Sequence, residues 1–175
     1  MPVARNVPGG GEYNIRSMNA AYVQGLRMLA MRELSVAQLR ARLLEREFTA
    51  ADVEAALERL IEEKALDDER VARAYAQTAV KVKGRGRLRV QRELHEMGIA
   101  RDVAAAALAD TYGDLDERRL IADALKKKLR VRGRLDTPAD YARVYQFLMR
   151  QGFSPSAVTA ALRAYRRPEH NPEEA

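Results

Sequence analysis

The 175-residue sequence contains no cysteine and no tryptophan, and only 6 % of its residues are aromatic. The absence of cysteine excludes disulfide bonds and thiolate metal sites, and it is compatible with a reducing compartment. No apolar run reaches the ~20 residues that a membrane-spanning helix requires. The first residues also lack the charged-then-apolar layout of a secretory signal. These absences predict a cytoplasmic protein that has no membrane partner.

The apolar residues that are present make up 47 % of the chain. Alanine and leucine supply most of them, whereas β-branched residues are scarce. Because alanine and leucine are strong helix formers, this composition predicts an all-α fold.

One sequence pattern occurs three times. In each copy a leucine lies five residues before a large apolar residue, and a second leucine closes an Ala-Ala-Leu triplet nine residues after it. The copies contain Leu43, Phe48 and Leu57, then Leu94, Ile99 and Leu108, then Leu148, Phe153 and Leu162. Their spacing of 51 and then 54 residues is typical of helical units that stack on their neighbours to complete a core.

The repeats predict how the chain is divided. We expect three-helix repeats over residues 19–65, 66–113 and 114–167, which together form an elongated, curved helical stack. Residues 1–18 and 168–175 contain too little apolar material to fold, so we expect a disordered arm and a disordered tail. A stack of helices offers a long surface and no obvious pocket, which favours a binding protein over an enzyme.

Several local signals mark helix starts and core faces. Ser35 with Gln38 forms a capping box, and Thr49 and Thr137 are expected to cap two further helices. A first helix is expected to bury a stripe formed by Tyr22, Leu26, Leu29 and Ala30. The tyrosines that lie at core spacing are interpreted as packing residues: Tyr75, Tyr112, Tyr141, Tyr145 and Tyr165.

Two glycines are expected to end helices in the left-handed conformation. Gly98 and Gly152 each lie four residues after the first leucine of their repeat, and glycine adopts positive φ without a steric cost. Glu47 occupies the same position in the first repeat. That helix should therefore end differently or bear strain.

The net charge is +6 and the pI is about 9.8, which favours an anionic partner. Two basic runs contain no acidic residue. They consist of Lys81, Lys83, Arg85, Arg87, Arg89 and Arg92, and of Lys126, Lys127, Lys128, Arg130, Arg132 and Arg134. The alternative interpretation is a solvated helix face, but so many uninterrupted cations repel one another, and this favours a polyanion or an acidic protein as partner.

The sequence offers little for catalysis. His95 and His170 are far apart, and residues 67–69 form the only tight carboxylate cluster. That cluster suits a metal or acid–base site less well than a helix start, where negative charge is favourable. Residues 84–87 lack the Gly-Lys-Ser/Thr ending of a nucleotide-binding loop. We therefore expect no catalytic, cofactor-binding or metal-binding residue.

The segments 66–75, 84–86 and 92–99 closely resemble the central signature of the RecX family, bacterial regulators of the RecA recombinase. The outer units agree: residues 32–43 resemble the first repeat of that family and residues 141–161 resemble the third. Two departures are Glu47, where the family commonly has glycine, and Val71, where it often has phenylalanine.

The resemblance implies a monomer of three tandem three-helix repeats that binds the RecA filament on single-stranded DNA. It further implies inhibition of RecA ATP hydrolysis, strand exchange and filament growth in recombination, DNA repair and the SOS response. The basic runs would then be the partner-binding residues. The rival interpretation is a protein that binds single- or double-stranded DNA directly through the same basic runs.

Overall fold

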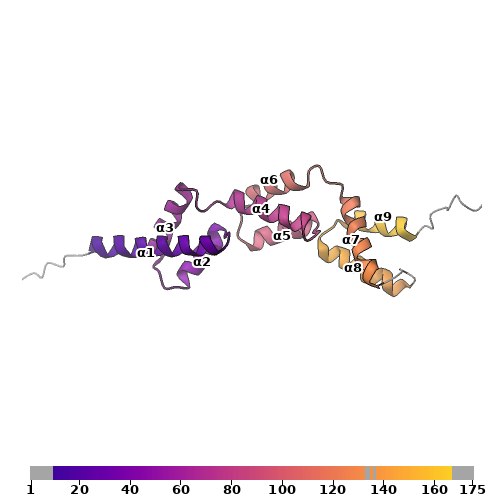
Figure 1. The fold of residues 1–175 in the computed structure, drawn as a ribbon, viewed down its shortest axis with the longest axis horizontal. Coiled ribbons are helices and arrows are strands. Elements are labelled where there is room, and N and C mark those ends of the chain that lie inside the picture. The colour runs from indigo at the N-terminus through magenta and orange to yellow at the C-terminus, as the bar shows by residue number, and fades with distance from the viewer. Residues whose placement is uncertain (1–9, 133–134, 136, 167–175) are drawn as a thin grey trace, which may run out of the picture. The chain divides into compact units, whose positions relative to one another are not determined.

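The structure is a computed structural model that describes residues 10–132, 135 and 137–166. Within these residues it contains nine α-helices and no strand (Figure 1). The predicted all-α fold is therefore confirmed. The elongated, curved form of the stack stays a prediction.

The described chain divides into two compact units. The first unit holds the residues up to Val71 together with Met97–Ala100. The second unit holds Ala72–Glu96 and the residues from Arg101 onward. Each unit therefore combines one complete set of three helices with part of the middle set.

The first three helices are α1 (Gly10–Met31), α2 (Val36–Leu44) and α3 (Ala50–Glu62). The predicted capping box opens α2, because the Ser35 side chain accepts the Gln38 N–H while the Gln38 side chain accepts the Ser35 N–H. Their core consists of buried residues of α2, of α3 and of the segments that follow α1 and α3: Leu34, Leu39, Leu43, Val53, Leu57, Leu60 and Leu66. Tyr22, Met28 and Leu29 of α1 are partly buried against it.

Helix α1 corrects two expectations. It begins at Gly10, so residues 10–18 are helical and do not belong to an unstructured arm. No proline or glycine occurs from Glu12 to Gln24, and extending an existing helix is far easier than nucleating one. The helix also buries Ala21 completely, whereas Leu26 remains 36 % exposed. The rest of the expected arm, residues 1–9, and the expected tail, residues 168–175, lie outside the described residues.

The middle helices are α4 (Asp68–Lys81), α5 (Arg87–Glu96) and α6 (Arg101–Tyr112). Small residues dominate the buried face of α4, where Ala72, Ala76 and Ala79 are almost completely buried. On α6, burial of Ala104, Ala107 and Leu108 continues the pattern.

The last helices are α7 (Glu117–Arg132), α8 (Pro138–Gln151) and α9 (Pro155–Arg166). Thr137 caps α8 as predicted, since its hydroxyl accepts the Asp140 N–H at 3.1 Å. The buried core of these helices consists of Ile121, Leu125, Val144, Leu148, Phe153, Val158 and Leu162. Tyr165, which we interpreted as a packing residue, is instead 51 % exposed.

The repeat alignment is confirmed at both of its leucine positions. The first leucines, Leu43, Leu94 and Leu148, are completely buried. The second leucines, Leu57, Leu108 and Leu162, are at most 1 % exposed. Three segments that share this burial pattern follow one structural plan.

The expected left-handed glycines are confirmed, and each is held against another helix start. Gly98 has φ +76° and Gly152 has φ +88°. A β-carbon on Gly98 would lie 2.4 Å from the Ala37 β-carbon, and one on Gly152 would lie 2.3 Å from the Arg89 backbone nitrogen. Neither position has room for a side chain. The turn and the packing between repeats therefore both require glycine.

Hydrogen bonds fix the same two junctions. In the first unit, the Ser35 hydroxyl donates to the Met97 carbonyl, and the Val36 N–H donates to the Asp68 carboxylate at 2.9 Å. In the second unit, the Gly86 N–H donates to the Gln151 carbonyl at 2.8 Å, and the Leu88 N–H to the Gly152 carbonyl at 3.1 Å. In both cases the end of one repeat's second helix meets the start of the preceding repeat's second helix.

Glu47 bears the strain that the sequence predicts. Its φ is +65°, so α2 leads into the same left-handed turn as the glycine repeats. The Glu47 side chain is exposed, and the turn is therefore possible with a side chain but not favourable.

Replacing Glu47 by glycine should stabilise the protein by about 0.5–1 kcal/mol, because relief of the left-handed conformation outweighs the larger unfolded-state entropy of glycine. Urea denaturation would measure the change. Glu45→Gly is the matched control, since Glu45 lies two residues earlier at φ −60° and should lose stability. Equal effects at both positions would contradict the assignment of strain to Glu47.

Candidate partner-binding surfaces

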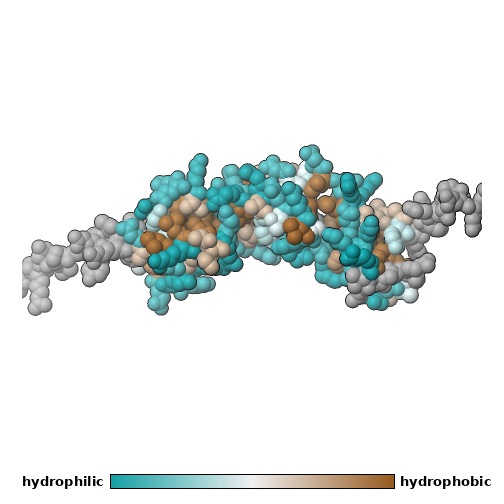
Figure 2. All heavy atoms as spheres, in the orientation of Figure 1, coloured by the Kyte–Doolittle hydropathy of each residue, from teal (hydrophilic) through white to brown (hydrophobic). Residues whose placement is uncertain are grey.

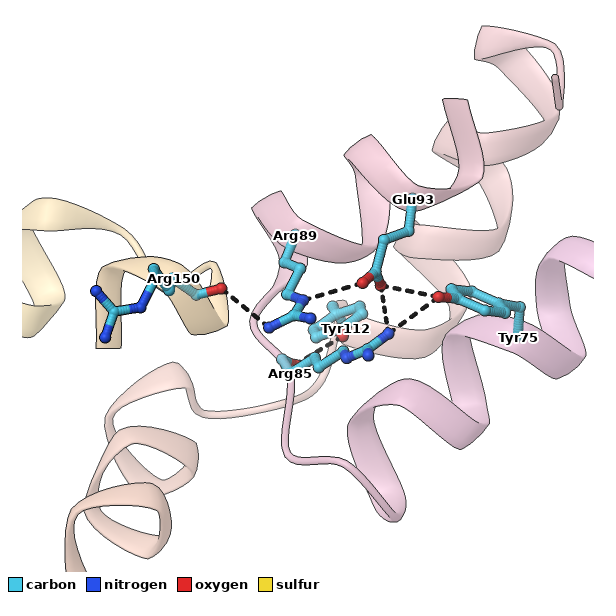
Figure 3. Close-up of polar contacts among 6 residues, drawn as sticks. All are labelled: Tyr75, Arg85, Arg89, Glu93, Tyr112 and Arg150. Atoms are coloured by element: carbon cyan, nitrogen blue, oxygen red, sulfur yellow. Dashed lines mark hydrogen bonds and ion pairs between the residues drawn. The ribbon is translucent and has the colours of Figure 1, made fainter. Parts of the chain in front are cut away.

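Two arginines of the first basic run point toward Glu93 of α5 (Figure 3). Arg85 Nη1 lies 2.6 Å from Glu93 Oε2, and Arg89 Nε lies 2.9 Å from Glu93 Oε1. The side chains of Arg85 and Glu93 are only 17 % and 18 % exposed. These two arginines are consequently ion-paired inside the second unit.

Two tyrosines complete this network. The Tyr75 hydroxyl donates to Glu93 Oε2 at 2.9 Å and accepts from Arg85 Nη1 at 3.0 Å. The Tyr112 hydroxyl donates to the Arg85 carbonyl at 2.8 Å, and burial raises the pKa of Tyr112 to about 12. Arg89 Nη1 also donates to the Arg150 carbonyl at 3.2 Å. The network thus ties α4, α5 and α6 to the end of α8.

Arg85 and Arg89 were predicted as partner-binding residues; in the structure both pair with Glu93, and their contact with a partner stays a prediction. Their guanidinium groups are held by a carboxylate that lies just beyond the acid-free run. The spacing of Arg89 and Glu93, four residues apart on a helix, is the signal that could have found one of these pairs in the sequence.

The network makes stability depend on pH. Burial raises the pKa of Glu93, whereas hydrogen bonds from Arg89 and Tyr75 and the charges of Arg85 and Arg89 lower it. The lowering effects together exceed the effect of burial, so the pKa of Glu93 lies below its ordinary value of 4.5. A carboxylate with a lowered folded-state pKa stabilises the protein above the unfolded-state pKa. This contribution is lost as the pH falls through the folded-state pKa.

Glu93→Gln should therefore lose stability near pH 7 and show a smaller further loss than the wild type when the pH falls below about 4.5. Unfolding by urea at a series of pH values measures both effects. Tyr75→Phe removes the hydroxyl's hydrogen bonds to Glu93 and from Arg85 but keeps both arginine–glutamate ion pairs, so it should keep most of the acid dependence. An unchanged acid dependence in Glu93→Gln would contradict this role.

The other cations of the first run are exposed. They are Lys81, Lys83, Arg87 and Arg92. Lys83 Nζ lies 5.7 Å from the centroid of the Tyr75 ring, a distance at which a cation and an aromatic face attract weakly. These four residues remain candidates for contact with a partner.

The second run is distributed around α7, because successive helix positions are about 100° apart. Lys126, Lys127 and Arg130 are exposed. Lys128 is half-buried, with its Nζ 4.7 Å from the centroid of the Phe147 ring on α8. The side chain of Arg132, and Arg134 as a whole, lie outside the described part of the chain.

A hollow of about 420 Å³ in the second unit brings the two runs together. We call it the basic hollow. Lys81 and Lys83 of the first run and Lys127 of the second line it. Its other lining residues are Gln77, Val80, Gly84, Asp110, Thr111, Leu115, Leu120, Asp123, Ala124, Phe147 and Gln151. The stack therefore does contain a concave site, which the sequence did not predict.

The described surface carries both hydrophilic and exposed apolar residues. Figure 2 shows hydrophilic residues over most of the visible described surface, with apolar residues exposed in patches. Leu115 lines the basic hollow and is 41 % exposed. Val82, between the lining residues Lys81 and Lys83 in the sequence, is 72 % exposed. A protein partner could contact such apolar side chains as well as the lysines.

Two of the three carboxylates of residues 67–69 have structural partners. Asp67 accepts the Arg70 N–H at 2.9 Å, and Asp68 accepts the Val36 N–H at 2.9 Å. Burial raises the pKa of Asp68, and the Val36 N–H partly offsets this effect. Among the residues that the structure describes, no group of three His, Asp or Glu side chains could hold a metal ion. The helix-start interpretation thus has direct support.

The fold and surfaces define a helical-repeat protein built from three-helix units. Family models described as the first, second and third three-helix domains of RecX match residues 21–60, 67–108 and 116–162. None of the described helices is long and apolar enough to cross a membrane.

Similar proteins include two named regulatory protein RecX. That of Halorhodospira halophila (strain DSM 244 / SL1) is 34 % identical over 143 residues, 79 % of this chain and 84 % of the relative. That of Geobacillus kaustophilus (strain HTA426) is 33 % identical over 143 residues, 81 % of this chain and 52 % of the relative. The chain thus matches about half the length of the Geobacillus relative.

Solved structures show the same fold. The crystal structure of RecX from Lactobacillus salivarius matches with a TM-score of 0.72 at 18 % identity, over 86 % of this chain and 97 % of that one. This likeness shows the fold. The sequence relatives and the family models show that the chain belongs to the RecX family of regulatory proteins.

Proposed function

We propose that this protein binds the RecA filament on single-stranded DNA and inhibits RecA ATP hydrolysis, strand exchange and filament growth. It would act as a cytoplasmic monomer in recombination, DNA repair and the SOS response. Membership of the RecX family supports the regulatory role. This role needs binding surfaces and no catalytic residue.

The basic hollow is the observation that supports the proposal most directly. It places Lys81, Lys83 and Lys127, which come from separate runs, around one concave surface. The same surface contains apolar side chains and two carboxylates, those of Asp110 and Asp123, so the lysines outnumber the acids by one. Such a surface suits an acidic protein partner, because complementary charge guides the encounter and apolar side chains contribute contact area. We assign partner binding to these lysines and to the exposed cations near them in the two runs.

Direct binding to DNA is the second candidate. The exposed positions of Arg87, Arg92, Lys126 and Arg130 favour it, since phosphate contacts need accessible cations and little else. Both candidates predict salt-sensitive binding.

Binding measurements on three immobilised targets separate the candidates: the RecA filament on single-stranded DNA, RecA alone, and single-stranded DNA alone. The filament proposal predicts binding to the filament and measurable binding to RecA without DNA. Binding to bare DNA that equals binding to the filament in affinity and salt dependence, with none to RecA alone, would replace it with the DNA-binding candidate.

A further inference from the structure

Helices α7 and α9 form a groove that is separate from the basic hollow. Its volume is about 880 Å³. The floor is aliphatic and contains Ala122, Leu125, Leu129, Ala160, Ala161 and Ala164. Tyr165, 51 % exposed, lies at its edge. We call this surface the α7–α9 groove.

Positive charge borders the groove. Arg118, Lys126 and Arg130 of α7 line it, and all three are exposed. Among the described residues that form the groove there is no carboxylate. At 1.5 Å per residue, Arg118 and Arg130, which are twelve positions apart, are separated by roughly 18 Å along α7, or more than three helical turns.

The small residues of α9 make the floor suitable for another helix. Ala160, Ala161 and Ala164 form the α9 side of this floor, and helices pack more closely where the contacting side chains are small. On α7, the half-buried Leu129 offers apolar contact, and Leu125, one turn earlier and only 5 % exposed, lies beneath it. An amphipathic helix binds such grooves through apolar residues at i, i+3 or i+4, and i+7.

We propose that the α7–α9 groove binds an amphipathic helix of a partner protein whose apolar face is flanked by Asp and Glu. The apolar face would lie on the aliphatic floor, and the acidic residues would meet Arg118, Lys126 and Arg130. Binding at this groove requires neither DNA nor the recombinase, so it can be measured separately from the proposed filament binding, although Lys126 and Arg130 also belong to the second basic run.

Single-stranded DNA fits the groove less well. Binding to single strands relies on bases stacked on aromatic side chains, and Tyr165 is the only aromatic among the described lining residues. A second copy of this chain fits poorly too. Its acidic helix α3 buries its apolar face in its own core, including Val53, Leu57 and Leu60.

Selection from a displayed library of 16-residue helix-forming peptides tests the proposal on the full chain. Peptides would be selected on the wild type and counter-selected on Ala164→Glu, which places bulk and negative charge in the groove at an exposed position. Ala142→Glu, an exposed alanine of α8 that does not line the groove, is the matched control. Circular dichroism would check that both variants retain wild-type helicity.

The expected result is enrichment of helices with an apolar stripe flanked by Asp and Glu, whose affinity falls at least tenfold in Ala164→Glu and is unchanged in Ala142→Glu. Fluorescence anisotropy of one labelled peptide should also show about threefold weaker binding to Lys126→Gln. The adjacent Lys127→Gln should bind like the wild type, because Lys127 lines the basic hollow instead.

Enrichment of basic or uncharged helices, or of peptides that do not distinguish Ala164→Glu from Ala142→Glu, would overturn the proposal. So would a 15-nucleotide oligothymidylate that binds in an Ala164-dependent manner while no acidic helix is enriched. None of these outcomes bears on filament binding, which is measured with RecA and DNA present.

Discussion

Gly152→Ala should destabilise the protein by about 2–5 kcal/mol, the sum of a left-handed φ for alanine and overpacking against a neighbouring backbone. The new β-carbon would lie 2.3 Å from the Arg89 nitrogen and 2.8 Å from its α-carbon. Both belong to the start of α5, which cannot move away without breaking the hydrogen bond from the Leu88 N–H to the Gly152 carbonyl.

A matched control separates the two causes. Gly84 also has positive φ, +59°, but a β-carbon there would meet nothing within 4 Å. Gly84→Ala should therefore cost about 1–2 kcal/mol, the conformational part alone. Urea denaturation of both variants measures the difference. Equal losses would show that close contact between the repeats does not restrict Gly152.

Reversing Lys81, Lys83 and Lys127 to glutamate should raise the concentration needed to inhibit the DNA-dependent RecA ATPase by tenfold or more, because like charges would then face an acidic partner. All three side chains are exposed and line the basic hollow. Lys128 is left unchanged, since its ammonium group packs over the Phe147 ring. The loss should shrink as salt rises, with screening over about 10 Å at 0.1 M.

The control for this variant carries the same change in net charge at other places. Arg27, Arg101 and Arg163 are exposed and line neither the basic hollow nor the α7–α9 groove. Their reversal to glutamate should reduce inhibition much less. If both triple variants lose inhibition equally, the effect comes from overall charge and the basic hollow has no special role. If neither loses it, its lysines form only a solvated face.

The sequence predicted those features of the fold that depend on neighbours in the chain. The capping box of Ser35 and Gln38, the left-handed glycines and the buried leucines of the repeats all follow from short, regular spacing. The predicted end of the N-terminal arm was wrong, because low apolar content in residues 10–18 does not prevent elongation of a helix that α2 and α3 already stabilise.

The candidate site was predicted less well, because it depends on which helices meet. The acid-free run ends at Arg92, and the next residue, Glu93, neutralises two of its arginines with help from tyrosines on α4 and α6. The basic hollow likewise joins Lys81 and Lys127, which are 46 residues apart. Charge counting finds the cations, but only the packing decides which of them reach a partner.

Inhibition of the RecA filament on single-stranded DNA by this RecX-family protein is the function that we propose. Its most direct test is the rate of RecA ATP hydrolysis on single-stranded DNA as the protein is titrated in, with the DNA in excess so that competition for DNA cannot lower the rate. We expect the rate to fall progressively at protein concentrations below that of RecA, since inhibited filament growth affects many subunits. An unchanged rate at equimolar protein would contradict the claim.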